Sequence, residues 1–408
     1  MKKESIKHIV LFCTVLLFSC TEKSKVAIVA MPEYDVEFEN SLVGQKIDTD
    51  GIINGKITNT RLDTVQSLIF YKSIQSYVGI ELFPNLKTLY VIFNASDVKD
   101  LDLSKNNKLE NIVIEANSPS SIRLNIQKCL NLKYLKTKKI DLSNIDFKIF
   151  DKLESLEIYN DGFTLNTLDL NKNVLLKFLK VYSSSSYLKL GIEKCENLES
   201  LILGVNNLSN LDFNNFQKLT KISVEISAFY PVDTKTLDIS NLSALKELSY
   251  KTPSVENIIL PKTSNIEIFT TYSVGLNNSV LNLEGQKKIT AFSLYGNTIK
   301  EIQWDSGNMN YLKYVLIDAS PVENLNLLGF KNLAGIEITN LNNLSEINIS
   351  GSVNIGAFYS RNNPNLKKIC LNSFQKIDTV SSFTNGGGSF PFPKWYKDNK
   401  NTYWGVCK

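Results

Sequence analysis

Histidine is almost absent from this chain, because His8 is the only one among 408 residues. Imidazole is the general base of Ser-His-Asp and Cys-His sites and a common zinc ligand. His8 lies in an N-terminal segment that we expect to be cleaved on export, so the mature chain would contain no histidine. Histidine-dependent catalysis and zinc binding through imidazole are therefore excluded for the mature chain.

An excess of charge of one sign is also lacking. The formal net charge is +4, and it falls to +2 once the three lysines and one glutamate of residues 1–19 are removed. Nucleic-acid-binding domains usually concentrate positive charge to neutralise phosphates. The near-neutral chain therefore gives no reason to expect a nucleic-acid partner.

Long apolar runs are missing outside the N-terminus. An apolar run of about ten residues, Ile9–Phe18, follows three lysines in residues 1–7. It is too short to span a bilayer and has the length of a signal-peptide core. No later stretch is long enough to cross a membrane, so we expect an exported chain with no transmembrane helix.

The apolar run ends in Leu17-Phe18-Ser19-Cys20. This stretch resembles the lipobox of bacterial lipoproteins, which implies that Cys20 is acylated several times and anchors the chain to a membrane. Thr21 follows it instead of aspartate, and by analogy with enteric bacteria this favours the outer membrane or cell surface. The alternative is a plain secretory signal cut near Cys20.

What the sequence does contain is a repeated pattern: an apolar residue, two variable residues, an apolar one, a variable one and another apolar one. The leading apolar residues mostly advance by 21 to 23 positions, with longer steps from Leu219 to Leu245 and from Leu333 to Leu366. The matches begin at Val65, Leu86, Leu109, Leu132, Leu153, Leu176, Leu198, Leu219, Leu245, Ile266, Ile289, Leu312, Leu333 and Leu366. A fixed period of this length indicates a solenoid.

A second, weaker copy of the pattern lies between the main copies, as in Leu101-Asp-Leu103 and Leu168-Asp-Leu170. Each coil of about 22 residues thus holds two short extended segments, and stacking of coils buries their inward faces in one core. We predict a mostly β solenoid. The convex side should hold short strands and turns, with little helix.

The stretches "LDLSKNNKLENI" (Leu101–Ile112) and "GIELFPNLKTL" (Gly79–Leu89) resemble the leucine-rich repeat family, in its Bacteroidetes-type extracytoplasmic form. The resemblance covers about Val65 to Leu371, and it implies a right-handed coil with one curved parallel sheet on its concave side. It implies a signal peptide over residues 1–19, an N-terminal tether over 20–64, a solenoid over 65–371 and a C-terminal cap over 372–408.

The asparagine of the family motif stands three residues after the last apolar one. The residues at this position are Asn94, Asn117 and Asn206 in main copies and Asn106 and Asn173 in second copies. We expect these side chains to point inward and satisfy backbone groups. Cys129 and Cys195 occupy the same place, 66 residues or three coils apart, so we interpret them as buried structural thiols.

Cys370 and Cys407 do not follow the period. Similar bacterial proteins end with a strand cysteine, a tryptophan-containing loop and a final cysteine. The resemblance therefore implies a Cys370–Cys407 disulfide that closes the cap, and export to an oxidising compartment is compatible with it.

The segment Asp48–Thr58, "DTDGIINGKIT", resembles a degraded calcium loop. Asp48, Asp50 and Asn54 offer oxygen atoms, but Ile52-Ile53 stands where a third ligand belongs and Asn59 replaces the bidentate glutamate. We therefore predict a polar turn and no metal site.

The exposed face of the predicted sheet is the remaining candidate. Its first variable position alternates in charge: Lys87, Glu110, Lys133, Glu154, Lys177 and Glu199. Such neighbours should pair and stabilise stacking. Aromatic residues interrupt the same face and form the candidate binding surface: Tyr90, Tyr134, Phe178, Tyr182, Tyr295 and Tyr314.

Together these features favour a monomeric, lipid-anchored leucine-rich repeat protein that binds a protein through its concave face, as an adhesion module. The alternative is a glycan-binding surface lipoprotein. Carboxylate pairs alone can support glycoside hydrolysis, but the acids lie in a repetitive ladder without a pocket, so we predict a non-enzyme with no cofactor.

Overall fold

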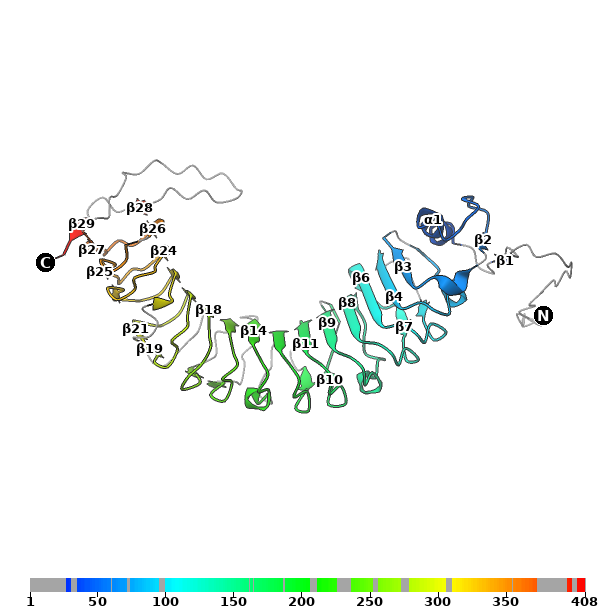
Figure 1. Ribbon diagram of the computed structural model, residues 1–408, viewed down its shortest axis with the longest axis horizontal. Coiled ribbons are helices and arrows are strands. Elements are labelled where there is room, and N and C mark those ends of the chain that lie inside the picture. The colour runs from blue at the N-terminus through cyan, green and yellow to red at the C-terminus, as the bar shows by residue number, and fades with distance from the viewer. Residues whose placement is uncertain are drawn as a thin grey trace, which may run out of the picture.

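The computed structural model describes residues 27–30, 35–59, 61–71, 74–94, 100–160, 162–163, 165–185, 188–205, 211–225, 236–251, 256–272, 279–305, 310–353, 355–372, 395–397 and 402–407. Structural statements below concern these residues. They form one elongated arc of stacked coils (Figure 1). None of the helices among them is both long and apolar enough to span a membrane.

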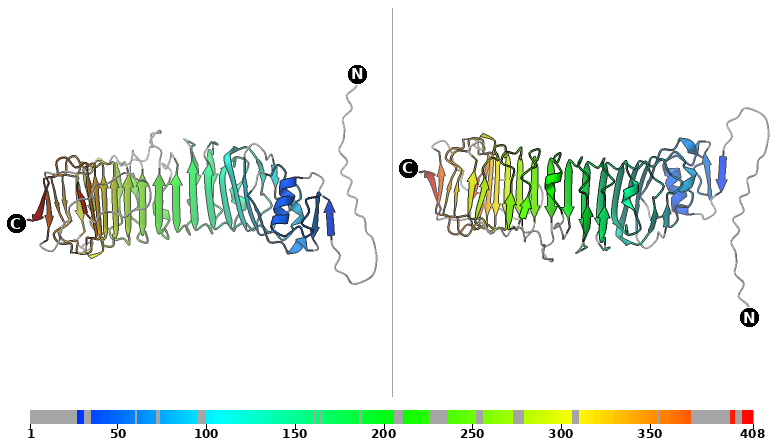
Figure 2. Two further views of the ribbon diagram at one scale, coloured as in Figure 1. Left: turned by 90° about the horizontal axis from the view of Figure 1, so that it is seen from above. Right: turned by 90° about the horizontal axis from the view of Figure 1, so that it is seen from below.

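The concave side of the arc is one parallel sheet of 15 strands, whose strands lie side by side along the whole molecule (Figure 2). In spatial order they are β3 (Ser67–Phe70), β4 (Thr88–Phe93), β6 (Asn111–Ser120), β8 (Tyr134–Ile140), β9 (Ser155–Asn160), β11 (Phe178–Ser183), β13 (Ser200–Gly204), β14 (Lys221–Glu225), β16 (Glu247–Lys251), β18 (Ile268–Tyr272), β20 (Ala291–Tyr295), β22 (Tyr314–Asp318), β24 (Gly335–Thr339), β26 (Ala357–Arg361) and β28 (Trp395–Lys397).

The convex side is divided into short sheets. Two-stranded sheets pair β5 (Asp100–Asp102) with β7 (Arg123–Asn125), β10 (Thr167–Asp169) with β12 (Lys189–Gly191), β15 (Thr236–Asp238) with β17 (Asn257–Ile259) and β19 (Val280–Leu283) with β21 (Glu301–Trp304). A four-stranded sheet follows, made of β23 (Asn324–Asn326), β25 (Glu346–Asn348), β27 (Lys368–Leu371) and β29 (Tyr403–Val406). Single 3₁₀ turns occur at η1 (Leu62–Thr64), η2 (Ile80–Leu82), η3 (Phe147–Ile149) and η4 (Phe213–Asn215).

The predicted fold class is confirmed, since the structure is a parallel β-solenoid of about 12 turns with little helix. Exposure alternates along the main strands, and in β11 Leu179 and Val181 are fully buried while their neighbours face solvent. Because no coil can bury its apolar face alone, the inward residues of neighbouring coils share one core along the arc.

One repeat assignment was wrong. Leu366, Ile369 and Leu371 belong to convex strand β27, 22 residues after the convex series member Leu344, and not to the concave sheet. The concave strand of that coil is β26, where Ser360 is buried at 2% exposure in the place of an apolar residue. This polar substitution removes the apolar signal on which the sequence assignment depended.

Helix α1 (Val36–Gly44) closes the N-terminal end of the core. Asp35 caps it by accepting hydrogen bonds from two N–H groups of the first turn. Phe38 and Leu42 are fully buried, and the Phe38 ring stacks on Phe70 of the first coil at a centroid distance of 5.2 Å. Beside α1, β1 (Ala27–Ala30) and β2 (Lys56–Asn59) pair antiparallel.

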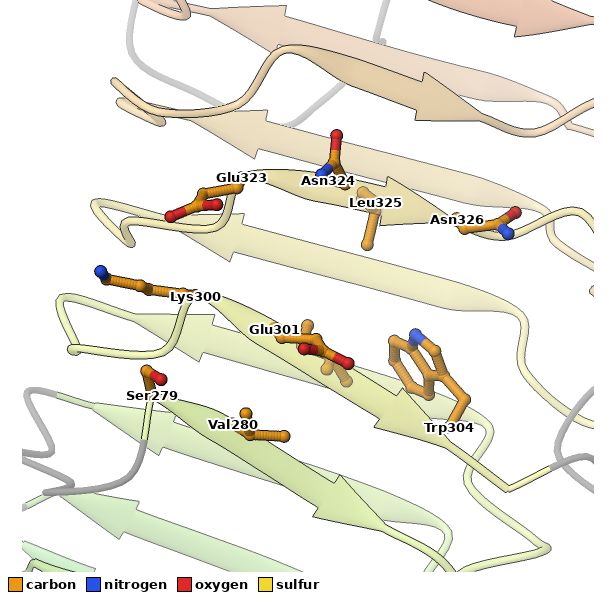
Figure 3. A pocket seen from close by; sticks show the side chains of 10 residues that line it. Ser279, Val280, Lys300, Glu301, Trp304, Glu323, Asn324, Leu325 and Asn326 are labelled. Carbon is orange, nitrogen blue, oxygen red and sulfur yellow. The ribbon is translucent and has the colours of Figure 1, made fainter.

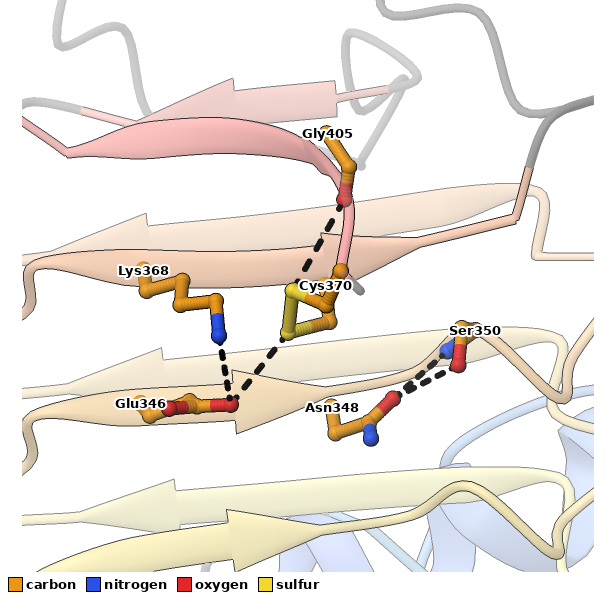
Figure 4. Close-up of a disulfide and its surroundings, with 7 residues drawn as sticks. Glu346, Asn348, Ser350, Lys368, Cys370 and Gly405 are labelled. Carbon is orange, nitrogen blue, oxygen red and sulfur yellow. Dashed lines mark hydrogen bonds and ion pairs between the residues drawn. A yellow bond between two sulfur atoms is a disulfide. The ribbon is translucent and has the colours of Figure 1, made fainter.

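A disulfide joins Cys370 in β27 to Cys407 just after β29, with 5.2 Å between their Cα atoms (Figure 4). Trp404 of β29 packs edge-to-face on Phe358 at 5.5 Å, so it covers the last coil of the core. The segment 373–394 between the two cysteines lies outside the described residues.

Removing the disulfide by the double substitution Cys370→Ser and Cys407→Ser should lower the free energy of unfolding by about 3–4 kcal/mol, because the bond closes a long loop. Urea denaturation followed by tryptophan fluorescence measures this loss. Reductant should destabilise the wild type equally and leave the double variant unchanged. Peptide mapping without reduction that finds both thiols free would contradict the linkage.

Candidate functional site: the concave face and the columns behind it

At the convex turns, inward-pointing side chains such as Asn106 and Asn173 form a column from coil to coil, and this column has a structural role. Asn106 is fully buried, and its Nδ2 donates to the carbonyl oxygens of Ile80 and Phe83 in the preceding coil at 2.8 and 3.1 Å. Asn173 does the same for Phe147 and Phe150 at 3.0 and 2.7 Å. The predicted inward role of these two asparagines is confirmed.

Cys129 and Cys195 stand in the same column, as predicted, and both are buried free thiols. The Sγ of Cys129 lies 3.6 Å from the carbonyl oxygen of Leu103, and that of Cys195 lies 3.3 Å from the carbonyl oxygen of Leu170. Burial is the main cause that raises the pKa of each thiol to about 12. They therefore remain protonated at neutral pH, which makes them unsuited to nucleophilic or redox chemistry.

The column also explains why the two cysteines are 66 residues apart. Three residue types follow one another from coil to coil: Phe83, Asn106, Cys129, then Phe150, Asn173, Cys195, then Phe216. Each phenylalanine is the residue directly after a 3₁₀ turn, namely η2, η3 and η4. The 66-residue spacing is thus a period of three coils, in which a bulky ring alternates with two hydrogen-bond donors.

The expectation for Asn94 and Asn117 was wrong, because both side chains are exposed. Strands β4 and β6 continue inward to Phe93 and Ala116, so the next residue points outward. The amide of Asn117 instead donates to Oδ1 of Asn94 at 2.8 Å on the surface. Asn206 lies outside the described residues.

The Asp48–Thr58 segment forms a hydrogen-bonded polar turn. The carboxylate of Asp50 accepts from Ile52 N–H at 2.9 Å, Asn54 Nδ2 at 3.2 Å and the Thr58 hydroxyl at 2.8 Å. Burial and the neighbouring Asp50 raise the pKa of Asp48, although the N–H of Thr58 opposes this. Because the oxygens of Asp50 are committed to the turn itself, we assign no metal here.

Part of the predicted charge ladder forms. Lys133 pairs with Glu110 at 2.7 Å and Lys177 with Glu154 at 2.8 Å. Hydrogen bonding to the lysine lowers the pKa of each glutamate. Among the described residues Lys87 and Glu199 make no ion pair. Exposed pairs of this kind contribute only a few tenths of a kcal/mol each, so the ladder aligns neighbouring coils without dominating stability.

A first group of outward side chains, the central cluster, lies on β8 to β11. Glu157 accepts from the hydroxyl of Tyr134 at 2.8 Å and from that of Tyr159 at 3.1 Å. Lys136 pairs with Glu115 of β6 at 2.7 Å, and both side chains are largely buried. Each carboxylate of this cluster therefore has a bonded partner within the protein.

Stacked rings complete the central cluster. Tyr159 and Tyr182 lie parallel, with centroids 5.6 Å apart and an interplanar angle of 9°. The ammonium of Lys180 is 5.0 Å from the first ring centroid and 5.5 Å from the second, which is a cation–π arrangement. The Tyr182 ring covers Gly204 of the next strand, where a Cβ atom would lie 2.1 Å from it.

A second group, the C-terminal patch, comprises Tyr272, Tyr295, Asp318 and Glu337 on β18 to β24. The two tyrosine rings stack with centroids 4.3 Å apart and an angle of 5°. Asn340 Nδ2 donates to Oδ1 of Asp318 at 2.7 Å, and the Thr339 hydroxyl donates to the same oxygen. Burial, and then the charge of Asp318, raises the pKa of Glu337.

The structure places all six aromatic residues predicted for the binding surface on concave strands: Tyr90, Tyr134, Phe178, Tyr182, Tyr295 and Tyr314. Sequence reasoning missed three that lie beside them, namely Tyr71, which contacts Tyr90 at 5.6 Å, and the in-register stacking partners Tyr159 and Tyr272. Their signal was a tyrosine directly following the last inward residue of a strand, which is Phe70, Ile158 and Thr271 respectively. Glu337 was missed because no pattern marks it.

The convex side carries a separate hollow of about 470 Å³ between β19, β21 and β23 (Figure 3). There β21 and β23 do not pair, although the concave strands β20 and β22 of the same coils do. Trp304 lies where these two strands separate, and its ring packs on those of Phe292 and Phe330 at centroid distances of 4.8 and 5.3 Å. Two further hollows, one lined by Ile258 and Pro261 and one between β23 and β25, also lie on the convex side.

No known protein family and no curated protein sequence matches the chain. Among solved structures, the functional domain of InlJ from Listeria monocytogenes, which includes a cysteine ladder, is similar with a TM-score of 0.54 at 18% identity, covering 85% of this chain and 77% of that one. The plant peptide hormone receptor RGFR1 in complex with RGF2 has a TM-score of 0.46 at 16% identity, covering 76% and 59%. An internalin, InlF, from Listeria monocytogenes has a TM-score of 0.43 at 15% identity, covering 83% and 89%. The likeness to InlJ shows a shared leucine-rich repeat fold.

Replacing Asn106 by alanine should lower the free energy of unfolding by about 2–3 kcal/mol, because two buried carbonyl groups lose their donor. The matched control Asn117→Ala removes an exposed amide and should change stability by no more than about 0.5 kcal/mol. Asn106→Cys, which copies the residue of the next coil, should recover part of the loss. Equal effects of the two alanine variants in urea denaturation would show that the column does not support the fold.

Proposed function

We propose that this chain is a leucine-rich repeat binding module that takes a protein or peptide partner on the concave face of its sheet. The observation that carries the proposal is the concentration of tyrosines on that face, in two stacked pairs and as exposed single rings. Tyr314 is 56% exposed there, and the apolar side chain of Ile268, in the same register two strands away, is 41% exposed. Tyrosine gives a large contact area at low entropic cost, which suits protein interfaces.

The shape of the face supports an extended partner. The sheet is continuous over all 15 strands and no helix of the described chain covers its concave side (Figure 1). Successive strands present outward side chains in parallel columns, so a partner strand or loop can contact several coils at once.

A glycan partner is supported less well. Sugar-binding platforms need aromatic ring faces that are open to solvent. In both stacked pairs each tyrosine covers one face of the other, and Lys180 lies over the Tyr159–Tyr182 pair. A protein side chain can use the ring edges and hydroxyl groups that remain, so we favour a protein partner.

Binding can be tested by selecting peptides from a random display library on the whole protein. We expect Tyr314→Ala, on the concave face, to weaken selected peptides by about tenfold, which corresponds to loss of one interface anchor. Tyr403→Ala on the convex strand β29 is the matched control, because Tyr403 has the same 56% exposure. Peptides that respond equally to both variants, or to neither, would contradict binding on the concave face.

We also propose that acylated Cys20, which lies outside the described residues, anchors the protein to the outer membrane or cell surface. Cys20→Ser should abolish incorporation of an alkyne fatty acid and release the protein from the membrane fraction, since the thiol is the acceptor of the lipid. Cys13→Ser, inside the signal segment, is the control and should label normally. A wild-type chain that takes up no fatty acid would rule out the anchor.

A further inference from the structure

The carboxylates of the concave strands fall into two classes. The described concave strands contain six carboxylates. The four in the N-terminal and middle parts bond to other side chains of the protein: Glu115 to Lys136, Glu157 to two tyrosines, Glu225 to Lys251 and Glu247 to Lys221. The remaining two, Asp318 and Glu337, lie on adjacent strands β22 and β24 and have no cationic partner among the described residues.

These two carboxylates are open to a donor in different ways. Both hydrogen bonds to Asp318 arrive at Oδ1, from the neutral groups of Thr339 and Asn340, so Oδ2 remains unbonded within the described chain. Glu337 is half-buried and makes no hydrogen bond or ion pair there. A carboxylate that is partly desolvated beside a like charge is destabilised in its ionised form, which the raised pKa of Glu337 reflects.

The surroundings fit a cationic side chain. The stacked pair Tyr272–Tyr295 lies on the neighbouring strands β18 and β20, and Tyr295 is in register with Asp318. Leu316 is in register with Glu337 and supplies an apolar wall. The aliphatic stem of an arginine or lysine packs well on tyrosine and leucine, while its charged head bonds to carboxylates.

A metal ion fits less well than an organic cation. Calcium and magnesium need six or more oxygen ligands in a compact shell. Among the described residues, the only compact group of three metal-ligating side chains is Glu346 with Cys370 and Cys407, and its two sulfur atoms are joined in the disulfide. Two carboxylates on an open sheet face favour a multi-atom cation that brings its own hydrogen-bond donors.

Resting on the proposed function, we propose that the C-terminal patch is the specificity site of the concave face and receives an arginine or lysine side chain of the partner on Glu337 and Asp318. The central cluster does not receive such a group, because its lysines already occupy or screen its carboxylates. The partner is therefore a protein segment that places a basic residue over β22 and β24 and a neutral or acidic stretch over β8 to β11.

The test uses a fluorescein-labelled peptide of glycine and serine with two arginines, and a matched peptide with the uncharged analogue citrulline at both positions. In fluorescence anisotropy with the whole protein, the arginine peptide should bind about tenfold more tightly than the citrulline peptide. Glu337→Gln, which keeps the size of the side chain, should remove most of that difference. The preference should also fade as the pH falls through the raised pKa of Glu337, since protonation removes its charge.

Glu157→Gln is the matched control, because it removes a carboxylate of the same sheet whose partners are internal tyrosines. It should change the affinity for the arginine peptide by less than about twofold. Circular dichroism confirms that both variants fold. Equal affinity for the two peptides, or equal effects of the two variants, would overturn the assignment of the basic side chain to this patch.

Failure of the basic-residue assignment can be distinguished from failure of concave-face binding. If library-selected peptides depend on Tyr314 but carry no basic residue and ignore Glu337→Gln, concave-face binding stands and this assignment fails. If no peptide binds the concave face and the neutral oligosaccharide cellohexaose binds instead, the proposed function fails and the assignment fails with it.

Discussion

Stacking of coils, on which the rest of the architecture depends, buries the backbone carbonyl groups inside the convex turns. In several coils a side-chain donor adds to the N–H hydrogen bonds that these carbonyls accept within their own turn. A buried carbonyl without a partner costs free energy comparable to a lost hydrogen bond. Different side chains do the same work along the arc: the amides of Asn106 and Asn173, the thiols of Cys129 and Cys195, the amide of Gln286 on Pro261 and the hydroxyl of Ser352 on Phe330. Asparagine, cysteine, glutamine and serine replace one another where a donor stands, whereas Phe83, Phe150 and Phe216 fill the same position in other coils with an apolar ring.

Once the coils are stacked, the two sides of the arc differ. Concave strands are in hydrogen-bonding register throughout, whereas convex strands pair only in short groups and separate between β21 and β23. Curvature brings the strands closer on one side than on the other, so the continuous sheet arises where the coils are closest. The continuous side is also the one that carries the stacked tyrosines. Among the described residues, a regular scaffold thus presents a long concave face that no helix covers.

The pairing of carboxylates also differs along the length of the concave face. In the first two thirds the carboxylates within the concave strands are bonded to lysines or tyrosines, as Glu115 is to Lys136 and Glu225 to Lys251. Near the C-terminus the pairing stops at Asp318 and Glu337. The ion pairs that align coils also neutralise the surface, and a surface neutralised from within has less to offer a charged partner. Recognition by charge is therefore expected where the internal pairing is incomplete.

The sequence alone determined the solenoid, its period, the inward leucines and the buried places of Asn106, Asn173, Cys129 and Cys195, because strand alternation and the repeat length are local and recur many times. The prediction misplaced Leu366 on the concave side because the polar Ser360 interrupts the apolar pattern of β26. It turned Asn94 and Asn117 inward because it ended the strands two residues before Phe93 and Ala116, where β4 and β6 still point inward. The stacking of Tyr159 on Tyr182 and the isolation of Glu337 were decided only by the tertiary structure. These features depend on which side chains of separate coils come into register, and residues more than twenty positions apart in the chain meet only after the coils have stacked.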